Sequence, residues 1–332
     1  MLNIGIIGAG RIGKVHTQSI VNYVRTAKVT AIADPFITEE TAAWAEGLGA
    51  KVSKNYLDII DDPDIDAVLI CSSTDTHSQI SLEAIAAGKH VFCEKPIDLD
   101  VGRINAVLEA LKAKPELKFT VGFNRRFDHN FRAIRNAVES GAIGKVELVK
   151  VTSRDPAPPS AEYAARSGGI FMDMTIHDFD MVRYLSGEEV ESVYVQPAVL
   201  VDPAIGEAGD FDSAVITMKL KSGALAVIDN SRRCAYGYDQ RAEVFGSLGA
   251  AASRNDAAST VEIATDGGVL AEKPLYFFLE RYMQAFATEV TEFIESVVND
   301  TPVPVDAQAG LAAVLIAIAA TESAKTGVVV KV

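Results

Sequence analysis

The fold is decided by the first stretch of the chain, Leu2–Gly13, which reads LNIGIIGAGRIG. Its apolar half is typical of a buried strand and leads directly into the pattern G-x-G-x-x-G, and a helical stretch, Lys14–Arg25, follows. The next apolar run, Val29–Ala33, ends at the acidic residue Asp34, about 20 residues after the last glycine. Together these features predict a strand-helix-strand unit that binds a dinucleotide. A glycine turn in an α/β domain that binds no nucleotide is the alternative interpretation.

Each glycine of this motif has a physical role. Gly8 permits the tight turn from strand to helix, Gly10 lets a pyrophosphate approach the backbone, and Gly13 lets the helix pack closely on the strand. The helix N-terminus then faces the phosphates with unpaired N–H groups and the positive end of the helix dipole. The loop residues Arg11 and Ile12 therefore belong to the expected cofactor site.

The acidic residue Asp34 selects between the two nicotinamide cofactors. Its carboxylate would accept hydrogen bonds from the ribose hydroxyls and would repel the additional phosphate of NADP. The following residues, Pro35–Thr38, include no arginine to neutralise such a phosphate. The sequence therefore predicts NAD.

Composition limits the class of protein. A chain of 332 residues with 48% hydrophobic content is large enough for two domains. Its formal net charge of -14 argues against nucleic acid or an anionic membrane surface as a partner, and a small neutral substrate fits better. The longest apolar run, Leu311–Ala320, is too short to span a bilayer, and the glycine-broken N-terminus is predicted to be a core strand instead of a signal peptide.

The three cysteines, Cys71, Cys93 and Cys234, lie in apolar, strand-like surroundings. They show no spacing typical of metal ligands, so reduced and buried thiols are expected, and with them a cytoplasmic location. No metal is expected.

Two domains with different patterns of secondary structure are predicted. Residues 1–122 alternate apolar runs with helical stretches, as in an NAD-binding Rossmann domain whose parallel sheet is covered on both faces. Its expected strands are Asn3–Ile7, Val29–Ala33, Ala67–Cys71, His90–Cys93 and Phe119–Gly122.

Residues 123–332 are predicted to form an α+β domain on a large, mainly antiparallel open sheet. Its expected strands and helices are Glu191–Leu200, Ser213–Leu220, Ala224–Asn230, Ala242–Phe245 and Val328–Val332, with His129–Ser140, Leu279–Asn299 and Ala307–Thr326. Since a one-sided sheet must cover its second face, a homo-oligomer is expected.

Polar residues follow the third expected strand at the sheet edge where ligands bind. The hydroxyls of Ser72, Ser73 and Thr74, together with His77, are expected to line the nicotinamide half of the site. Helix capping by Thr74 or Asp75 is a compatible alternative.

The segment Cys93–Pro96, which reads CEKP, follows the fourth expected strand. Pro96 keeps Lys95 out of the helical region, and the peptide bond between them can be cis. Glu94 and Lys95 would thus be fixed beside the expected nicotinamide position, where an ordinary lysine would instead lie on a solvated helix face.

A second polar group lies in Gly168–Leu185, which is predicted to be a helix after a glycine pair. Asp173, His177 and Asp180 are spaced i, i+4 and i+7, so they would share one face of that helix. The carboxylate could then orient the imidazole as a base. The alternatives are a helix cap, a core histidine and a surface acid; a metal site is disfavoured because no closed ligand set is present and Lys95 would repel a cation.

Four motifs stand together in this chain: GAGRIG at Gly8–Gly13, EKP at Glu94–Pro96, GFNRRFD at Gly122–Asp128, and the pair Asp173 and His177. In this combination the sequence resembles the Gfo/Idh/MocA oxidoreductases along essentially the whole chain. The stretches Ser153–Pro156, Ser167–Met174, Ile176–Met181 and Tyr236–Arg241 resemble the branch of that family that oxidises inositols.

This resemblance implies a tetramer in which Lys95, Asp173 and His177 are catalytic. It also implies five polyol contacts, namely Asn124, Asp155, Asp180, Tyr236 and Tyr282, although the sequence alone does not distinguish Tyr236 from Tyr238. The implied reaction is NAD-dependent oxidation of a ring hydroxyl of myo-inositol to the ketone. Oxidation of another cyclitol or a sugar, such as scyllo-inositol or an aldose, is one alternative. A catalytically silent NAD-binding regulator is another.

Overall fold

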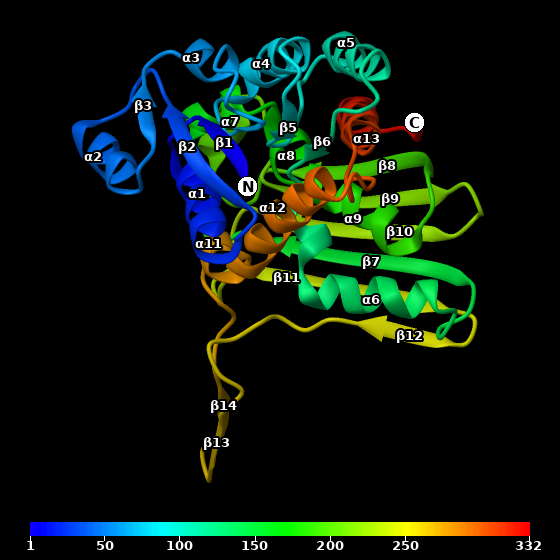
Figure 1. Cartoon of the computed structure of the whole chain (residues 1–332). Coiled ribbons are helices and arrows are strands. Elements are labelled where there is room, and N and C mark those ends of the chain that lie inside the picture. Colours follow the sequence, from blue (N-terminus) through cyan, green and yellow to red (C-terminus); the bar gives the residue numbers. More distant parts are fainter. The chain divides into compact units, whose positions relative to one another are not determined.

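A computed structural model describes residues 1–332 of the chain, which divides into two units (Figure 1). The first unit consists of Met1–Phe127 and Gln284–Val314, and the second of Asp128–Met283 and Leu315–Val332. The expected division was a single cut between residues 122 and 123. In the structure, the segment 284–314 also belongs to the first unit.

The first unit is built on a six-stranded, fully parallel sheet in the order β3-β2-β1-β4-β5-β6. The strand order reverses beside β1, which is the arrangement of a doubly wound Rossmann sheet, so the predicted fold class is confirmed. The strands are β1 (Leu2–Ile7), β2 (Ala27–Ala33), β3 (Lys51–Ser53), β4 (Ala67–Ile70), β5 (His90–Cys93) and β6 (Phe119–Val121). The helices are α1 (Arg11–Tyr23), α2 (Glu39–Gly47), α3 (Leu57–Ile60), α4 (Thr74–Ala86), α5 (Val101–Lys112) and the 3-10 helix η1 (Asn124–Phe127).

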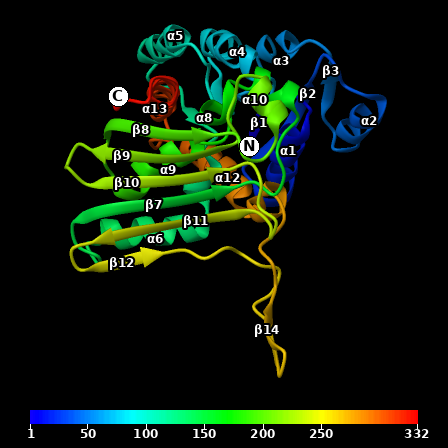
Figure 2. The ribbon, with the colours of Figure 1, turned by 180° about the vertical axis from the view of Figure 1, so that it is seen from behind.

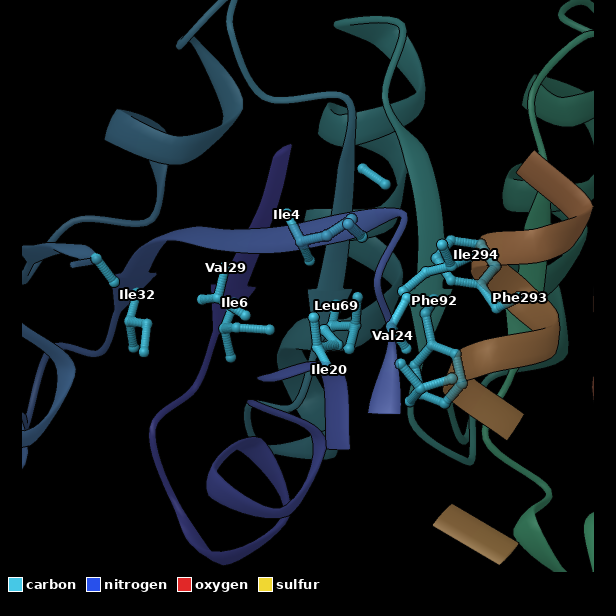
Figure 3. Close-up of a cluster of buried hydrophobic side chains, with 14 of the residues drawn as sticks. Ile4, Ile6, Ile20, Val24, Val29, Ile32, Leu69, Phe92, Phe293 and Ile294 are labelled. Carbon is cyan, nitrogen blue, oxygen red and sulfur yellow. The ribbon is translucent and has the colours of Figure 1, made fainter. Parts of the chain in front are cut away.

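A helix from far along the chain completes the core of this unit. Val290, Phe293 and Ile294 of α12 (Met283–Val298) are buried in one cluster with strand residues that include Leu69 and Phe92 (Figure 3). The rings of Phe92 and Phe293 meet edge to face with centroids 5.8 Å apart. The parallel sheet therefore depends on α12 to cover part of its apolar surface.

The second unit is built on a seven-stranded sheet in the order β12-β11-β7-β10-β9-β8-β15 (Figure 2). All neighbouring pairs are antiparallel except β7 and β10, so the sheet is mixed but mainly antiparallel, as predicted. The strands are β7 (Val146–Arg154), β8 (Val190–Ala198), β9 (Ser213–Leu220), β10 (Leu225–Ser231), β11 (Asp239–Gly246), β12 (Gly249–Ala252) and β15 (Val330–Lys331). The helices are α6 (His129–Glu139), α7 (Ala161–Arg166), α8 (Gly169–Asp173), α9 (Ile176–Ser186), α10 (Pro203–Glu207) and α11 (Phe278–Arg281). Helix α13 (Ala307–Thr326) begins in the first unit and ends in the second, because the division falls after Val314.

One face of this sheet is covered and the other is open. Helices α6 and α9 lie on the same side of the sheet in both views (Figures 1 and 2). Along β9 the residues alternate between buried and exposed, with Ile216 fully buried and Val215 50% exposed. On the open face, Leu225 and Phe245 are exposed as well.

A two-stranded ribbon, β13 (Glu262–Thr265) and β14 (Gly268–Ala271), extends away from the sheet (Figures 1 and 2). Every residue of both strands is exposed, including Ile263 and Leu270. An isolated hairpin of this kind is marginal in water, so its apolar side chains need cover from elsewhere.

Helix α13 is long and apolar enough to cross a membrane by length and composition alone. However, 61% of its apolar window is buried inside the chain, as in the core helix of a globular protein.

Truncation of one α12 side chain tests whether this helix supports the core of the first unit. Phe293→Ala should reduce the free energy of unfolding by about 3–5 kcal/mol, since Phe293 is fully buried and its loss leaves a cavity. Urea titration followed by circular dichroism measures the change. Val298→Ala, at an exposed position of the same helix, is the control and should change stability by less than about 0.5 kcal/mol. Equal stability of the two variants would contradict this role of α12.

Candidate active site

The glycine loop after β1 combines close packing with one open position. At Gly8, where φ is +99°, an added Cβ would lie 2.6 Å from the carbonyl carbon of Cys71, and one at Gly13 would lie 1.9 Å from the carbonyl oxygen of Gly8. By contrast, a Cβ at Gly10 would meet nothing within 4 Å. Gly10 is the N-cap residue of α1 and makes no side-chain cap bond. An open backbone position at an uncapped helix N-terminus fits a pyrophosphate, which needs both space and N–H donors.

The carboxylate of Asp34 is tied to this loop. One oxygen accepts a hydrogen bond from the N–H of Ala9 over 2.8 Å, and the other accepts one from the N–H of Phe36 over 2.7 Å. Asp34 is therefore fixed beside the glycine loop and remains half-buried, with further lone pairs to accept ribose hydroxyls.

The residues after β4 divide into surface and buried groups. Ser72 and Thr76 share a hydrogen bond of 2.7 Å. His77 is 2% exposed, and its ring nitrogens lie 2.8 Å from the carbonyl oxygen of Pro96 and 3.1 Å from that of Ser72. His77, expected among the cofactor residues, thus joins two loops of the site. The N-cap of α4 is Ser73 without a side-chain cap bond, so the alternative of capping by Thr74 or Asp75 is not observed.

The segment after β5 carries the two charged residues expected at the nicotinamide position. The bond between Lys95 and Pro96 is cis, as the sequence allowed. Glu94 and Lys95 are half-buried, and Glu94 Oε1 lies 2.7 Å from His16 Nε2. We call the carboxyl ends of β1, β2, β4 and β5, where these loops meet, the cofactor edge. Asn124, the polyol contact expected from the first unit, lies buried at the start of η1.

The helix predicted over Gly168–Leu185 consists of two helices, α8 and α9, separated by a break. Thr175 in this break donates its hydroxyl proton to Asn230 Oδ1 over 2.7 Å in buried surroundings, which anchors the break to β10. Asp173 ends α8, whereas His177 lies in the first turn of α9. The prediction of one continuous helix is therefore wrong, because the helix is interrupted between Asp173 and His177.

A buried arginine links two of the expected site carboxylates. Arg232, 4% exposed, donates to Asp173 Oδ2 over 2.9 Å and to Asp155 Oδ2 over 3.3 Å. Tyr163 donates its hydroxyl proton to Asp173 Oδ1 over 3.0 Å. The sequence analysis did not identify Arg232 or Tyr163. The one sequence signal that could have pointed to Arg232 was the run of polar residues that follows the apolar part of β10.

The electrostatics of this group follow from burial and charge. Burial alone would lower the pKa of Arg232, but the charges of Asp173 and Asp155 outweigh it and raise that pKa. Burial, and then the charge of Asp173, raise the pKa of Tyr163 to about 12. Arg232 is therefore a cation and Tyr163 a neutral hydroxyl donor near neutral pH.

A layer of buried polar groups lies between α9 and the covered face of the sheet. Asn230 donates its amide proton to Asp178 Oδ2 over 2.8 Å, and Ser153 donates to Gln240 Oε1 over 3.1 Å. Asp180, also on α9, is fully buried, whereas His177 is half-buried. This layer fixes the helix that carries His177.

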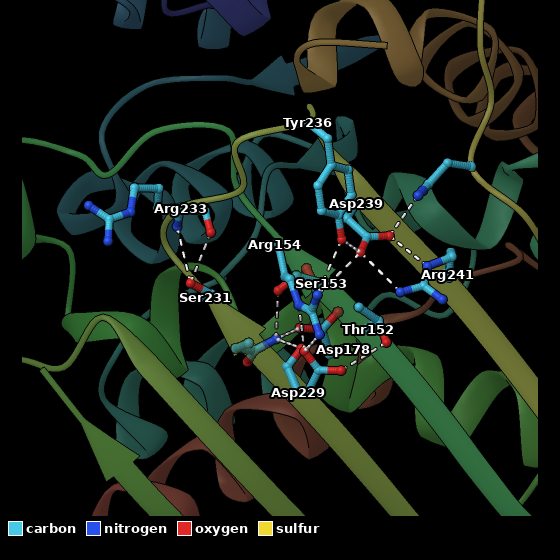
Figure 4. A network of polar contacts seen from close by, with 12 residues as sticks. Thr152, Ser153, Arg154, Asp178, Asp229, Ser231, Arg233, Tyr236, Asp239 and Arg241 are labelled. Atoms are coloured by element: carbon cyan, nitrogen blue, oxygen red, sulfur yellow. Dashed lines mark hydrogen bonds and ion pairs between the residues drawn. The ribbon is translucent and has the colours of Figure 1, made fainter. Parts of the chain in front are cut away.

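The open face of the sheet carries a separate ionic network (Figure 4). Arg154 donates to Asp229 Oδ1 over 2.8 Å and to the hydroxyl of Tyr236 over 3.2 Å. Tyr236 in turn donates to Asp239 Oδ2 over 2.6 Å. Burial would raise the pKa of Asp239, but hydrogen bonds from Arg241, Tyr236 and a neighbouring asparagine lower it to about 2. The bond to Asp239 is the largest cause that raises the pKa of Tyr236 to about 12.

Strand alternation separates this network from the buried polar layer. Successive residues of β7 point to opposite faces, so Ser153 bonds to Gln240 in the buried layer while Arg154 bonds to Asp229 in the network. Asp155 follows the end of β7 and meets Arg232. The structure therefore brings Asp155 and Asp173 together but places the hydroxyl of Tyr236 elsewhere. Tyr238 and Tyr282 are buried with their rings edge to face, at a centroid distance of 6.0 Å.

Two glycine substitutions separate folding from cofactor binding. Gly10→Ala should leave the unfolding temperature unchanged, because its Cβ meets open space, but should weaken NADH binding by obstructing the phosphates. Gly13→Ala should lower the unfolding temperature, because its Cβ would overlap the carbonyl oxygen of Gly8. Thermal unfolding and NADH fluorescence titration measure the two effects. Unchanged NADH affinity in Gly10→Ala would contradict the proposed phosphate position.

Known families match both parts of the chain. Residues 2–123 match an oxidoreductase family with an NAD-binding Rossmann fold, and residues 131–252 match the GFO/IDH/MocA C-terminal domain. The chain is 47% identical over 323 residues to a myo-inositol 2-dehydrogenase of Thermotoga maritima, covering 97% of this chain and 96% of that protein. It is 48% identical over 322 residues to an inositol 2-dehydrogenase of Rhizobium meliloti, covering 96% of each.

Solved structures agree with these matches. A putative myo-inositol dehydrogenase from Sinorhizobium meliloti superposes with a TM-score of 0.95 at 45% identity, covering 100% of this chain and 99% of that one. A scyllo-inositol dehydrogenase from Lactobacillus casei with bound NAD(H) and scyllo-inositol superposes with a TM-score of 0.92 at 32% identity, covering 100% and 99%. With its parallel N-terminal sheet, glycine loop and mixed C-terminal sheet, the chain belongs to the Gfo/Idh/MocA family of NAD-binding oxidoreductases.

Proposed function

We propose that this protein is an NAD-dependent inositol 2-dehydrogenase that oxidises one ring CH–OH of myo-inositol to a ketone. Relatives named for this activity match nearly the full chain at 47% and 48% identity. The structural observation that carries the proposal is the group around Asp173. Two carboxylates converge on one buried arginine beside the helix that bears His177, in a chain whose other unit has an NAD-binding fold.

His177 is the proposed base. It is half-buried in the first turn of α9, and it would accept the proton of the reacting hydroxyl. Asp173 would orient the imidazole and stabilise its protonated form. The contacts from Arg232 and Tyr163 restrain both oxygens of Asp173, so its position is fixed before substrate binds.

Lys95 of the first unit is proposed to act on the same hydroxyl. Its ammonium group would stabilise the negative charge that develops on the oxygen as the proton leaves. Bound NAD would accept the hydride from the carbinol carbon.

Ring hydroxyls are the proposed basis of specificity. Asp155, whose side chain is 19% exposed, is the proposed principal polyol contact, with Asn124 and Asp180 as further polar groups. A site lined with buried hydrogen-bonding groups rejects molecules that lack the partner hydroxyl. Oxidation of scyllo-inositol is the second candidate, because a relative of that activity is 34% identical to this chain over 328 residues.

Initial rates of NADH formation with myo-inositol, scyllo-inositol and glucose test the proposal. Myo-inositol should give the highest kcat/KM, and His177→Ala should lower kcat by about 10²–10⁴-fold, as is typical when a general base is lost. His129→Ala, which removes a 55% exposed histidine from the second unit, is the control and should retain full turnover. Full turnover by His177→Ala would exclude this base, and no turnover of any polyol would favour an NAD-binding regulator.

We also propose that the protein is a cytoplasmic homotetramer. The open face of the sheet exposes Val215, Leu225 and Phe245, and the ribbon β13–β14 exposes further apolar residues, so a second copy of the chain is the natural cover for both. The three cysteines are unpaired, which agrees with a reducing compartment.

Sedimentation tests the oligomer. The mass of the intact protein, measured by sedimentation, should be about four times the chain mass of 35.4 kDa. Phe245→Glu, which places a charge on the open face, should yield smaller species. Tyr23→Glu, at a 67% exposed position of the first unit, is the matched control and should leave the tetramer intact. A wild-type monomer would contradict the proposal.

A further inference from the structure

A buried polar cluster in the first unit lies directly behind the cofactor edge. Its members are His16 of α1, Glu94 after β5 and Glu289 of α12, and we call it the His16 cluster. His16 and Glu289 are fully buried, whereas the side chain of Glu94 is 14% exposed. His16 Nε2 lies 2.7 Å from Glu94 Oε1 and 4.0 Å from Glu289 Oε1.

Glu289 is an unusual member because neither of its carboxyl oxygens has a hydrogen-bond partner. An ionised carboxylate in such a place would be very costly, whereas a neutral carboxylic acid is tolerated. Burial raises the pKa of Glu289 well above its ordinary value, and the charge of Glu94 raises it further. Glu289 therefore stays a neutral acid to higher pH than an exposed glutamate does.

Two further titratable groups feel the charges of the cluster. They are the thiols of Cys71, after β4, and Cys93, at the end of β5. Burial raises the pKa of both thiols above the ordinary value, and the charge of Glu94 adds to the shift in each. Both thiols are therefore neutral and add no charge to the cluster.

The contacts of His16 identify its tautomer. Nε2 is within hydrogen-bonding distance of Glu94, while Nδ1 is buried without a partner. An unpaired buried N–H would cost more than a bare nitrogen, so Nε2 carries the proton and donates it to the Glu94 carboxylate. The rings of Phe92 and Phe286 lie edge-on to the imidazole, with centroids 5.0 and 5.8 Å away, and fix its orientation.

The carboxylate of Glu94 is consequently held by the hydrogen bond from His16, and it packs against Gly122. Its carboxyl group lies 3.0 Å from the position that a Cβ on Gly122 would occupy, so a side chain there would crowd it. We propose that His16 and neutral Glu289 are positioning residues for the cofactor, which hold Glu94 as an oriented carboxylate that accepts the hydroxyls of the ribose next to the nicotinamide. This inference rests on the NAD-binding fold and on the proposed cofactor role of Glu94.

The proposal makes cofactor affinity depend on the charge of Glu289. If Glu289 ionised, two carboxylates would compete for the one Nε2–H of His16 and repel each other, and Glu94 would lose its orientation. NADH affinity should therefore fall as pH rises toward the pKa of Glu289. Glu289→Gln, which has the same shape and stays neutral, should abolish this fall.

The pH dependence of the free energy of unfolding is an independent test of the charge state of Glu289. The folded-state pKa of Glu289 is raised, so the folded protein keeps the proton that the unfolded chain releases above its ordinary value of 4.5. The stabilising contribution of this group is thus fully present below that value and is lost progressively as pH rises above it. The unfolding temperature of Glu289→Gln should therefore exceed that of the wild type by a margin that grows with pH. Glu295→Gln, at an exposed position of α12, is the control and should show no such trend.

NADH fluorescence titration of the full-length protein tests the positioning role, because it needs no substrate turnover. His16→Leu, which removes the donor, should weaken NADH binding about tenfold or more, as expected for a lost hydrogen bond to a charged group. His16→Gln, which restores an N–H donor, should recover most of the affinity. Glu289→Gln should bind NADH as tightly as the wild type near neutral pH.

Three results would overturn the inference. They are NADH affinity unchanged in His16→Leu, NADH binding weakened about tenfold near neutral pH in a folded Glu289→Gln, and a stoichiometric metal ion in the wild type that His16→Leu loses. Glu289→Gln keeps the inference testable if His16→Leu does not fold. The cyclitol rates are independent of these titrations, so failure of the proposed substrate and failure of this inference are distinguishable.

Discussion

The first unit depends on a backbone contact that leaves no room for a side chain. At Gly13 a Cβ would lie 1.9 Å from the carbonyl oxygen of Gly8, and at Gly8 it would lie 2.6 Å from the backbone of β4's end. These contacts bring α1 close to the sheet, so that its uncapped N-terminus opens at the cofactor edge. The same helix carries His16 inward to Glu94. One turn of backbone thus sets both the phosphate position and the orientation of the Glu94 carboxylate, which follows β5.

In the second unit, the alternation of β7 has a comparable role. Because neighbouring residues point to opposite faces, Ser153 enters the buried polar layer while Arg154 enters the ionic network of the open face, although the two are adjacent in sequence. Asp155, just past the end of the strand, meets Arg232. The covered side is backed by the buried polar layer at α9, where Thr175 donates to Asn230 of β10 and Asn230 donates to Asp178. A polar site can therefore be held rigidly without exposing its supports to solvent.

Much of the architecture could be predicted from sequence because parallel strands are continuous apolar runs. Strands β1, β2, β4, β5 and β6 were expected within about two residues of their ends. The continuous helix over Gly168–Leu185 was not correct, since helical spacing does not reveal that Thr175 bonds to a distant asparagine and anchors a break. Arg232 was missed for a related reason: its two acidic partners come from separate parts of the chain, and only the folded sheet joins them. The position of α12 likewise depends on tertiary packing, which no local pattern encodes.

The return of α12 to the first unit affects how the protein is made. The ribosome completes the strands of the parallel sheet early, but Phe293 and Ile294, which close its core, emerge only after nearly the whole second unit has been synthesised. Until then Phe92 and the ring of His16 lack their cover from that helix. The nucleotide-binding half is therefore first in translation, yet it reaches its native packing only after α12 has emerged. A nascent chain of this kind carries an incomplete hydrophobic surface during most of its synthesis.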